Sequence, residues 1–260
     1  MQRPIAYILA ASNHGTMIVN RHDYHKTENG AYGVGYDILN YSAFAQDELN
    51  ALKLLLDSRK FNYGPGVVVL DCGANLGVHT VECAKHMHGW GEVTAIEAQE
   101  RVFYALAGNI AINNCFNARA IWAAVGEVSG VISVPEPNYF IPSSFGSLEI
   151  KQRDYSENIG QAIDYKENLS QTKIIPIDEL GFSRLDFIKM DVEGMEAEAL
   201  TGAKTTIARF KPQLFIEKAK SDTDVIAAFL TDFGYKFTTI GINFLAIHET
   251  DPAISMISAE

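Results

Sequence analysis

Apolar residues recur with two periods along this chain, and the pattern predicts strands that alternate with helices. Continuous apolar runs indicate buried strands at residues 67–71, 92–97, 119–125, 185–191 and 213–217. Apolar residues at helical spacing predict the helices between and after them, at residues 76–88, 101–113, 195–210 and 222–233. Two more strands are expected after Gly234, at residues 235–240 and 243–248. This alternation is typical of an α/β fold with a largely parallel sheet.

Two parts of the chain depart from the alternation. At the start, residues 5–10 and 16–19 predict a hairpin, and leucines at helical spacing around residue 52 predict a helix. Between them, residues 21–41 are rich in glycine and tyrosine, which indicates a lid or loop rather than core. Residues 135–172 form an insertion with many prolines, serines and glycines. Long irregular insertions are usually functional or disordered, so we expect it to fold over the ligand edge of the sheet.

These observations predict a single domain over residues 1–260. It would consist of an N-terminal extension at residues 1–60 and a Rossmann-like body at residues 61–260, with the insertion inside the body.

The first strand of the body ends in a turn with the pattern Asp-x-Gly-x-x-x-Gly. The pattern is formed by Asp71, Gly73 and Gly77. Glycines leave room for a ligand against the backbone, and open α/β sheets bind ligands at the carboxyl ends of their strands. Glu97 ends the second strand, at about the distance from the glycine turn at which an acidic residue holds a ribose diol. The turn and Glu97 together predict an adenosine-containing cofactor.

The spacing of this turn favours S-adenosylmethionine over NAD. A dinucleotide site needs Gly-x-Gly-x-x-Gly, because the pyrophosphate lies on the helix N-terminus. The carboxylate of Asp71 would repel a pyrophosphate but suits the ammonium of a methionine moiety. The carboxylate of that moiety would lie at the positive end of the helix dipole.

The strand at residues 185–191 ends in a second acidic turn. Asp191, Glu193 and Gly194 follow its apolar residues, and Glu196 lies at the start of the next helix. Because this strand is expected beside the first strand, Asp191 and Glu193 should face the same crevice as Asp71. They could bind the cofactor ammonium, hold a substrate hydroxyl or act as a general base. For Glu196, a structural role at the helix N-terminus is as well supported as a functional one.

Three segments carry a closer resemblance to known proteins. They are Asp71-Cys-Gly-Ala-Asn-Leu-Gly-Val-His-Thr80, Ile188-Lys-Met-Asp-Val-Glu-Gly-Met-Glu196 with Ala199-Leu-Thr-Gly-Ala203, and Lys211-Pro-Gln-Leu-Phe-Ile-Glu217. Over about residues 67–217 the chain resembles the FkbM-type S-adenosylmethionine-dependent methyltransferases. The stretch Lys-x-Asp-x-Glu-Gly-x-Glu is fairly specific to that family, whereas the glycine turn marks only the wider methyltransferase class.

The resemblance implies a fold and a set of site residues. The fold is the Rossmann-like, seven-stranded methyltransferase sheet, with helices on both faces and an antiparallel last strand. Catalytic roles are implied for Asp191 and Glu193, which would lie beside the transferring methyl group. Cofactor-binding roles are implied for Asp71, Gly73, Asn75 and Gly77 at the methionine end, for Glu97 at the ribose, and for Asn109 and Asp191.

Composition adds expectations about partners and compartment. The formal net charge of −11 argues against a broad nucleic-acid-binding surface. The three cysteines, Cys72, Cys83 and Cys115, form no CxxC motif, and we expect reduced thiols in a cytoplasmic protein. No apolar run is long enough to cross a membrane, and no signal peptide is recognisable. The histidine spacing gives no metal site, and the oligomeric state cannot be inferred.

The expected function is therefore methyl transfer from S-adenosylmethionine. As the resemblance implies, the acceptor would be a hydroxyl of a sugar, glycan or secondary metabolite, and no metal would be needed. Two alternatives stay open: N-methylation of an amine or a protein, and a cofactor-binding protein without catalysis. The missing Gly-x-Gly-x-x-Gly pattern disfavours an NAD-dependent oxidoreductase.

Overall fold

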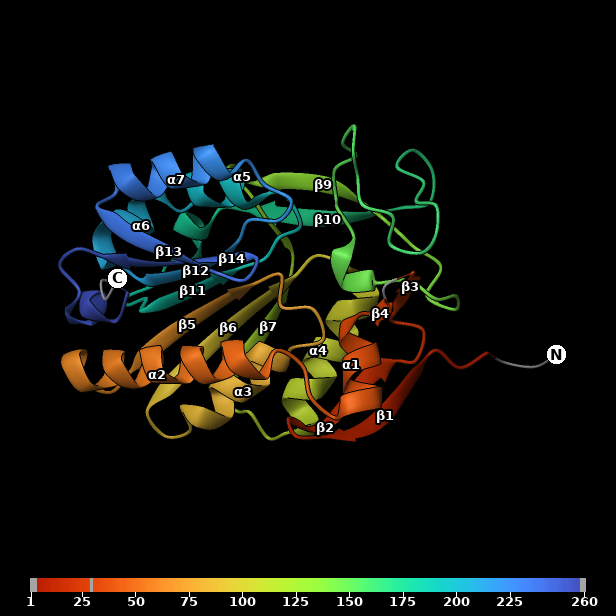
Figure 1. Cartoon of the computed structure of the whole chain (residues 1–260), viewed down its shortest axis with the longest axis horizontal. Coiled ribbons are helices and arrows are strands. Elements are labelled where there is room, and N and C mark those ends of the chain that lie inside the picture. The colour runs from red at the N-terminus through yellow and green to blue at the C-terminus, as the bar shows by residue number, and fades with distance from the viewer. Residues whose placement is uncertain (1–3, 29, 258–260) are drawn as a thin grey trace.

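The computed structural model describes residues 4–28 and 30–257, and a seven-stranded sheet forms its centre (Figure 1). From one edge to the other, the strands are β13 (Tyr235–Ile240), β14 (Asn243–His248), β12 (Gln213–Glu217), β11 (Phe187–Met190), β5 (Val67–Cys72), β6 (Gly91–Glu97) and β7 (Ala118–Trp122). The strand β14 is antiparallel to both of its neighbours, while β12, β11, β5, β6 and β7 pair in parallel. The predicted fold class, including the antiparallel last strand, is confirmed.

Helices cover both faces of this sheet because its central strands are apolar on both faces. In β5, Val67 and Val69 face one hydrophobic cluster, while Val68, Leu70 and Cys72 face another. The first cluster is covered by α2 (Gln46–Tyr63) and α3 (Val78–His86), with α4 (Glu100–Ile112) on the same side (Figure 1). The opposite face is covered by α5 (Glu196–Thr201), α6 (Lys204–Phe210) and α7 (Thr223–Asp232).

The strand expected at residues 119–125 is divided between two sheets. β7 ends at Trp122, and the backbone N–H of Ala123 donates to the carbonyl of Glu97. The next residues form β8 (Ala124–Val125), which pairs with β10 (Leu169–Ile175) instead of extending the large sheet. β9 (Gly130–Pro135) pairs antiparallel with the other edge of β10 and completes a three-stranded sheet.

The helix expected at residues 195–210 is also divided, into α5 and α6. The break lies at Gly202, where a Cβ atom would lie 2.1 Å from the carbonyl oxygen of Gly126. The Gly202 carbonyl accepts a hydrogen bond from the Asp178 N–H instead of continuing the helix. The Asp178 carboxylate in turn accepts the Thr205 and Thr206 N–H groups at the start of α6. The apolar periodicity continues from α5 into α6, so the sequence pattern does not indicate the break.

The N-terminal part contains the expected hairpin and more regular structure than the sequence indicates. The hairpin is β1 (Tyr7–Ser12) paired with β2 (Gly15–Asn20). Residues 21–41, expected to be a lid or loop, include β3 (His25–Thr27), β4 (Gly30–Tyr32) and α1 (Val34–Tyr41). The stretch is partly core, since Ile38 is buried against the β1–β2 hairpin. Residues 1–3 and Asn29, which belong to the expected extension, and residues 258–260 lie outside the described residues.

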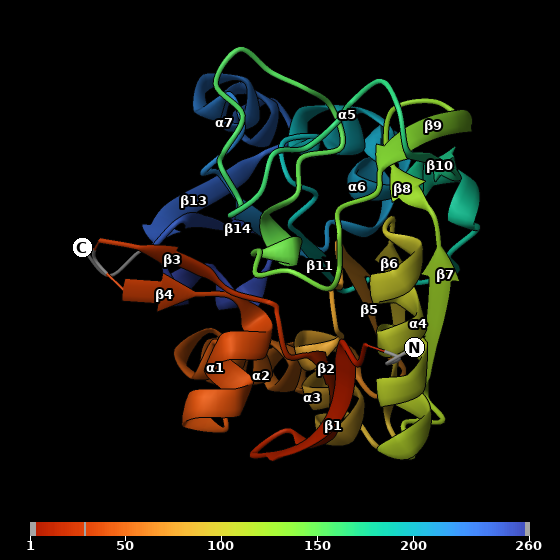
Figure 2. The ribbon, with the colours of Figure 1, turned by 90° about the vertical axis from the view of Figure 1, so that its right-hand side faces the viewer.

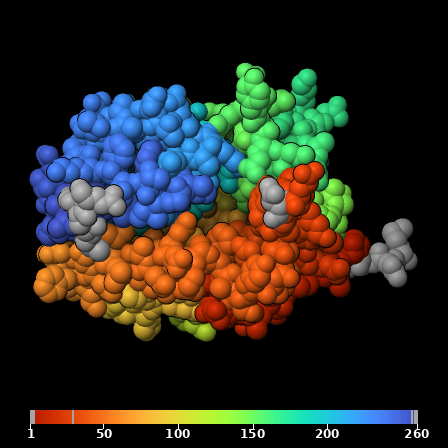
Figure 3. Space-filling view, in the orientation of Figure 1, coloured from red at the N-terminus to blue at the C-terminus, as the bar shows by residue number. Residues whose placement is uncertain are grey.

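The insertion lies against this N-terminal part at the carboxyl edge of the sheet. Figure 2 looks onto that edge, and Figure 3 shows the insertion in contact with the segment that contains β3 and β4. Buried Asp23 joins the two segments, because its carboxylate accepts the N–H groups of Gly35 and Phe145. Short 3-10 turns complete the fold at Phe145–Ser147, Ile177–Leu180 and Pro252–Met256. Within residues 4–28 and 30–257, no helix is long and apolar enough to cross a membrane.

Candidate functional site

A cavity of about 560 Å³ opens at the carboxyl edge of the sheet, at the point where the strand order turns between β5 and β11. We call it the edge cavity. Residues from the turns after β5, β6 and β11 and from the insertion line it, among them Gly73, Asn75, Glu97, Gln99, Val125, Gly146, Leu148, Ile150, Asp191 and Glu193.

The glycine turn after β5 forms one wall of the edge cavity, and its backbone requires Gly73. The φ angle of Gly73 is 73°, and a Cβ atom there would lie 1.7 Å from the Asp191 carbonyl oxygen. The two acidic turns can therefore approach each other only because this residue has no side chain. Asn75 also has a positive φ, 52°, which asparagine tolerates better than most residues.

Glu97 ends β6 with its carboxylate at the same wall. One carboxylate oxygen accepts the Asn75 N–H at 2.9 Å, and the other accepts the Gln99 N–H at 2.8 Å. Burial raises the pKa of Glu97 to about 7, although these N–H groups act in the opposite direction. The side chain thus orients the glycine turn, and each of its oxygens keeps further acceptor capacity for a ligand.

A second, smaller cavity of about 310 Å³ lies on the other side of the glycine turn. It shares Gly73, Asn75 and Asp191 with the edge cavity, so the two spaces meet at these residues. Val34 and Phe44 from the N-terminal part close it, and Lys189 lies at its base. A ligand that extends along the glycine turn would reach both cavities, one end near Glu97 and the other near Lys189.

Three of the predicted cofactor residues lie beneath these cavities and do not line them. The Asp71 carboxylate accepts a hydrogen bond from the Thr80 hydroxyl at 2.6 Å and lies 3.9 Å from the Lys189 ammonium. Gly77 precedes α3, and its missing Cβ atom lets Leu106 of α4 pack closely. Both residues shape the turn from below, and the structure does not bring the Asp71 carboxylate into the cavity where a ligand ammonium would meet it.

Asn109, the third of them, is fully buried in α4. Its amide oxygen accepts the Ile18 N–H, and its amide nitrogen donates to the carbonyl oxygens of Ile18 at 3.1 Å and Leu76 at 2.8 Å. The side chain therefore ties β2 to the glycine turn. Because these hydrogen-bonding groups are used within the protein, the geometry favours a supporting role, and a direct cofactor contact stays a prediction.

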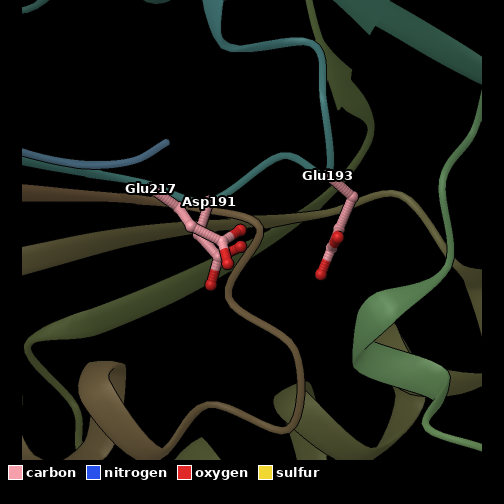
Figure 4. A group of neighbouring side chains, drawn as sticks. All are labelled: Asp191, Glu193 and Glu217. Atoms are coloured by element: carbon pink, nitrogen blue, oxygen red, sulfur yellow. The ribbon is translucent and has the colours of Figure 1, made fainter. Parts of the chain in front are cut away.

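Three carboxylates meet at the ends of β11 and β12. Figure 4 shows the carboxylates of Asp191 and Glu217 side by side, with that of Glu193 directed toward the same space. One oxygen of each lies within 4.8 Å of one oxygen of the other two. The structure thus brings Asp191 and Glu193 together at the edge cavity and adds Glu217, which sequence reasoning did not single out as a site residue.

Burial and mutual repulsion set the protonation of these carboxylates. They raise the pKa of Glu217 to about 10, so Glu217 is neutral near pH 7 and shares a hydrogen bond with Asp191. Burial and the Asp191 charge raise the pKa of Glu193 to about 8, against the effect of Lys220. Burial alone would raise the pKa of Asp191, but the Lys189 ammonium, 3.0 Å away, and the bond with Glu217 lower it overall.

Two lysines therefore balance the cluster. Burial acts to lower the pKa of Lys189, but Asp191 and Asp71 raise it overall, so the ammonium stays charged within the sheet. Lys220, between β12 and α7, pairs with Glu193 at 2.5 Å. A lysine within the otherwise apolar run of β11 marks Lys189 as unusual for a buried strand, whereas no local pattern marks Lys220. With one acid neutral and two lysines present, the charges of the cluster are largely balanced by groups of the protein itself.

Glu196 has a structural role in this site. It is 1% exposed, and one carboxylate oxygen accepts the N–H groups of Val192 at 2.9 Å and Gly194 at 3.3 Å. The other oxygen accepts the Ser221 hydroxyl. Glu196 thus fixes the turn that carries Glu193, which supports the structural one of the two roles that the sequence left open for it.

Comparison with known families now adds to this geometry. The model of the methyltransferase FkbM domain matches residues 71–237, which include both acidic turns, the insertion and β12. The chain belongs to the FkbM methyltransferase domain family. The resemblance that the sequence motifs indicate is thereby confirmed. No curated protein matches the chain.

Solved structures with a similar arrangement are distant in sequence. The FkbM methyltransferase of Methylobacillus flagellatus KT is 20% identical, with a TM-score of 0.49, over 70% of this chain and 44% of that one. This chain therefore spans less than half the length of that protein. A precorrin-6y C5,15-methyltransferase of Geobacter metallireducens GS-15 is 13% identical, with a TM-score of 0.42, over 78% and 89%. A SAM-dependent methyltransferase of Aquifex aeolicus is 14% identical, with a TM-score of 0.36, over 79% and 97%.

Proposed function

We propose that this FkbM domain binds S-adenosylmethionine at the edge cavity and transfers its methyl group to a hydroxyl of a small molecule or glycan. The observation that carries the proposal is the placement of Glu97, the glycine turn and Asp191 around one cavity at the switch point of the sheet. Glu97 would accept hydrogen bonds from the ribose diol. The apolar side chains of Val125, Leu148 and Ile150 would surround the base.

The amino-acid end of the cofactor would extend past Gly73 into the smaller cavity. The Lys189 ammonium at its base suits a carboxylate, and the Asp191 carboxylate, which lines both cavities, suits an ammonium. This differs from the expectation that Asp71 meets the ammonium directly. Asp71 instead contributes to holding Lys189 in its charged form.

The transfer itself requires alignment and the removal of one proton. When bound, S-adenosylmethionine supplies an electrophilic methyl group, so the protein has to hold the acceptor oxygen in line with it. We assign the proton to Glu193, because its raised pKa of about 8 lies close to neutral pH, where general bases act efficiently. Asp191, kept ionised by Lys189, would hold the acceptor hydroxyl or the cofactor ammonium in place.

A second acceptor class is favoured by one specific observation. The acidic groups of Asp191, Glu193 and Glu217, which lie within 4.8 Å of one another, also offer several hydrogen-bond acceptors to an amine. N-methylation would require the amine to lose its proton before attack, and Glu193 could accept it. The two acceptor classes therefore share the same residues and differ in the group that is methylated.

A labelled methyl donor separates these possibilities. The protein is incubated with S-[methyl-¹⁴C]adenosylmethionine and fractions of sugars, glycans, hydroxylated metabolites, amines and proteins, with and without a chelator. We expect label in a hydroxyl-bearing fraction and equal transfer with the chelator present. Label only in amine or protein fractions would support N-methylation. Binding of the cofactor without transfer to any fraction would support a cofactor-binding protein without catalysis.

A further inference from the structure

Lys220 lies where separate parts of the chain meet above the edge cavity. It belongs to the loop between β12 and α7, and its side chain is 12% exposed. Its ammonium contacts Oε2 of Glu193 at 2.5 Å, Oε2 of Glu157 at 2.7 Å and the carbonyl oxygen of Ser147 at 2.8 Å. An ammonium group has three N–H donors, so these partners use all of them. We call Lys220, Glu193, Glu157, Ser147 and Tyr32 the Lys220 cluster.

Two of the three partners of Lys220 come from the insertion. Ser147 ends a 3-10 turn, and the residues on either side of it, Gly146 and Leu148, line the edge cavity. Glu157 lies farther along, and its other carboxylate oxygen accepts the Tyr32 hydroxyl of β4 at 2.7 Å. The ammonium of Lys220 therefore holds the insertion over the cavity, and through Glu157 it also holds the β3–β4 hairpin.

The third partner, Glu193, needs such support because of its backbone. Its φ angle is 53°, in the left-handed region that is unfavourable for residues with a side chain, and Gly194 follows at 91°. Such a conformation persists only when surrounding contacts hold it, and residues in such conformations are often found at functional sites. Lys220 supplies the contact to the Glu193 side chain. Arg153 of the insertion donates to the Lys220 carbonyl and lies against Gly194, so it braces the same turn.

We propose that Lys220 is a positioning residue that couples closure of the insertion over the edge cavity to the orientation of the Glu193 carboxylate. The Lys220 ammonium contacts both the insertion and Glu193. If the insertion moves away from the edge cavity, Lys220 loses two of its three partners, and the Glu193 side chain is no longer held in one orientation. The part of the inference that concerns Glu193 in catalysis rests on the proposed function. The closure itself does not, because it follows from contacts within the chain.

A simple stabilising ion pair is the alternative reading of the same contacts. Ion pairs on the protein surface contribute little to stability, and the loss of one leaves distant segments unchanged. Lys220 differs in being mostly buried and in joining segments that are more than 60 positions apart, as its contact with Ser147 illustrates. The two readings predict different results for the insertion when the charge of Lys220 is removed.

The test uses hydrogen exchange of the ligand-free chain and dissociation of S-adenosylhomocysteine as a probe. Lys220→Met keeps the length of the side chain and removes the charge. We expect backbone amides of residues 144–157 to exchange at least about tenfold faster, and the probe to dissociate faster by a similar factor, since contacts to a charged group are lost. Lys220→Arg should restore slow exchange in part, because a guanidinium can still donate to both carboxylates.

Two further variants make the test specific. Lys218→Met removes a charge from the same loop, where the Lys218 ammonium lies over the Phe244 ring, and it should leave both rates unchanged. Glu157→Gln should open the insertion less than Lys220→Met does and should add little in the double variant, because Glu157 acts through Lys220. If Lys220→Met does not fold, Glu157→Gln replaces it and should by itself speed exchange of residues 144–157, because it removes the ion pair between Lys220 and the insertion.

Unchanged exchange of residues 144–157 in a folded Lys220→Met variant, or in Glu157→Gln if Lys220→Met does not fold, would overturn the inference. The same holds if Lys218→Met has as large an effect as Lys220→Met. Failure of the wild-type chain to bind S-adenosylhomocysteine would count against the proposed function instead. The exchange experiment without ligand would still decide whether Lys220 holds the insertion.

Discussion

At the scale of single residues, the site depends on carboxylates whose protonation is set by their neighbours. Lys189 keeps Asp191 ionised, while burial and the nearby charges keep Glu217 neutral and bring the pKa of Glu193 to about 8. One acid is thus charged, one is protonated, and one titrates near neutral pH. This separation of acids in a single cluster suits a site that holds one group and accepts a proton from another.

Glu193→Gln and Asp191→Asn should lower methyl transfer more than they weaken binding of S-adenosylhomocysteine. For Glu193→Gln we expect a loss of about 10²–10⁴-fold in turnover, the usual contribution of a positioned general base. Because the base must be unprotonated, the wild-type rate should rise with pH and level off above about 8, and this rise should disappear in the variant. Turnover is measured with the acceptor found by labelling. Wild-type turnover in both variants would make these residues structural.

Glu97 should make cofactor binding depend on pH. Burial raises its pKa to about 7, so the carboxylate that accepts the ribose hydroxyls is lost as the pH falls below 7. Affinity for S-adenosylhomocysteine should therefore increase from about pH 6 to pH 8, and Glu97→Gln should weaken binding by about 1.5–3 kcal/mol and remove the pH dependence. Titration calorimetry at several pH values measures both effects. A variant with wild-type affinity and the same pH dependence would contradict this role.

Sequence reasoning found the residues of this site that lie at strand ends or just after them, because the end of a strand fixes where these residues lie. Glu97, Asp191 and Glu193 are of this kind, and all three line the edge cavity. Lys220 could not be found in this way, because its partners come from an insertion whose path has no periodic pattern. Asn109 was found by resemblance, but only coordinates show that its amide is used by β2 and the glycine turn.

At the scale of elements, the glycine turn is held from below by α4 and β2. Asn109→Ala would leave the Ile18 N–H and the Ile18 and Leu76 carbonyl oxygens without their buried partner. We expect the free energy of unfolding to fall by about 2–4 kcal/mol, since buried polar groups would lose their hydrogen bonds. Urea denaturation measures this change. A large loss of cofactor affinity without a loss of stability would indicate direct binding instead.

The insertion should determine which acceptor is used. It contributes Gly146, Leu148 and Ile150 to the edge cavity and lies against the segment that contains β3 and β4. Replacing residues 138–164 by a short Gly-Ser linker should keep the seven-stranded sheet but broaden or abolish acceptor preference, because the covering wall is removed. Transfer to a panel of acceptors tests this, with circular dichroism as a control for folding and binding of S-adenosylhomocysteine as a control for the cofactor site, because Leu148 and Ile150 would also be removed. An unchanged preference would exclude the insertion from the acceptor site.

The element boundaries that sequence reasoning missed have specific physical causes. The helix at residues 195–210 breaks because Gly202 packs on the Gly126 carbonyl, and the strand at residues 119–125 divides because β8 pairs with β10. Both causes are contacts between distant segments, which apolar periodicity does not record. The central strands were predicted well because each is apolar on both faces and is bounded by turn residues.

At the scale of the whole molecule, two parts of the chain cover the carboxyl edge of the sheet. The sheet and its helices form the base, while the N-terminal part and the insertion meet over the carboxyl edge (Figure 2). Asp23 and the Lys220 cluster join these coverings to each other and to the acidic turn. The central claim is that this edge binds S-adenosylmethionine, and the other proposals about catalysis depend on it.

Titration calorimetry with S-adenosylhomocysteine and, separately, with NAD tests that claim most directly. The account predicts one S-adenosylhomocysteine bound per chain, with binding weakened in Glu97→Ala, and no comparable binding of NAD. Equal or stronger binding of NAD, or binding of S-adenosylhomocysteine that Glu97→Ala leaves unchanged, would contradict it.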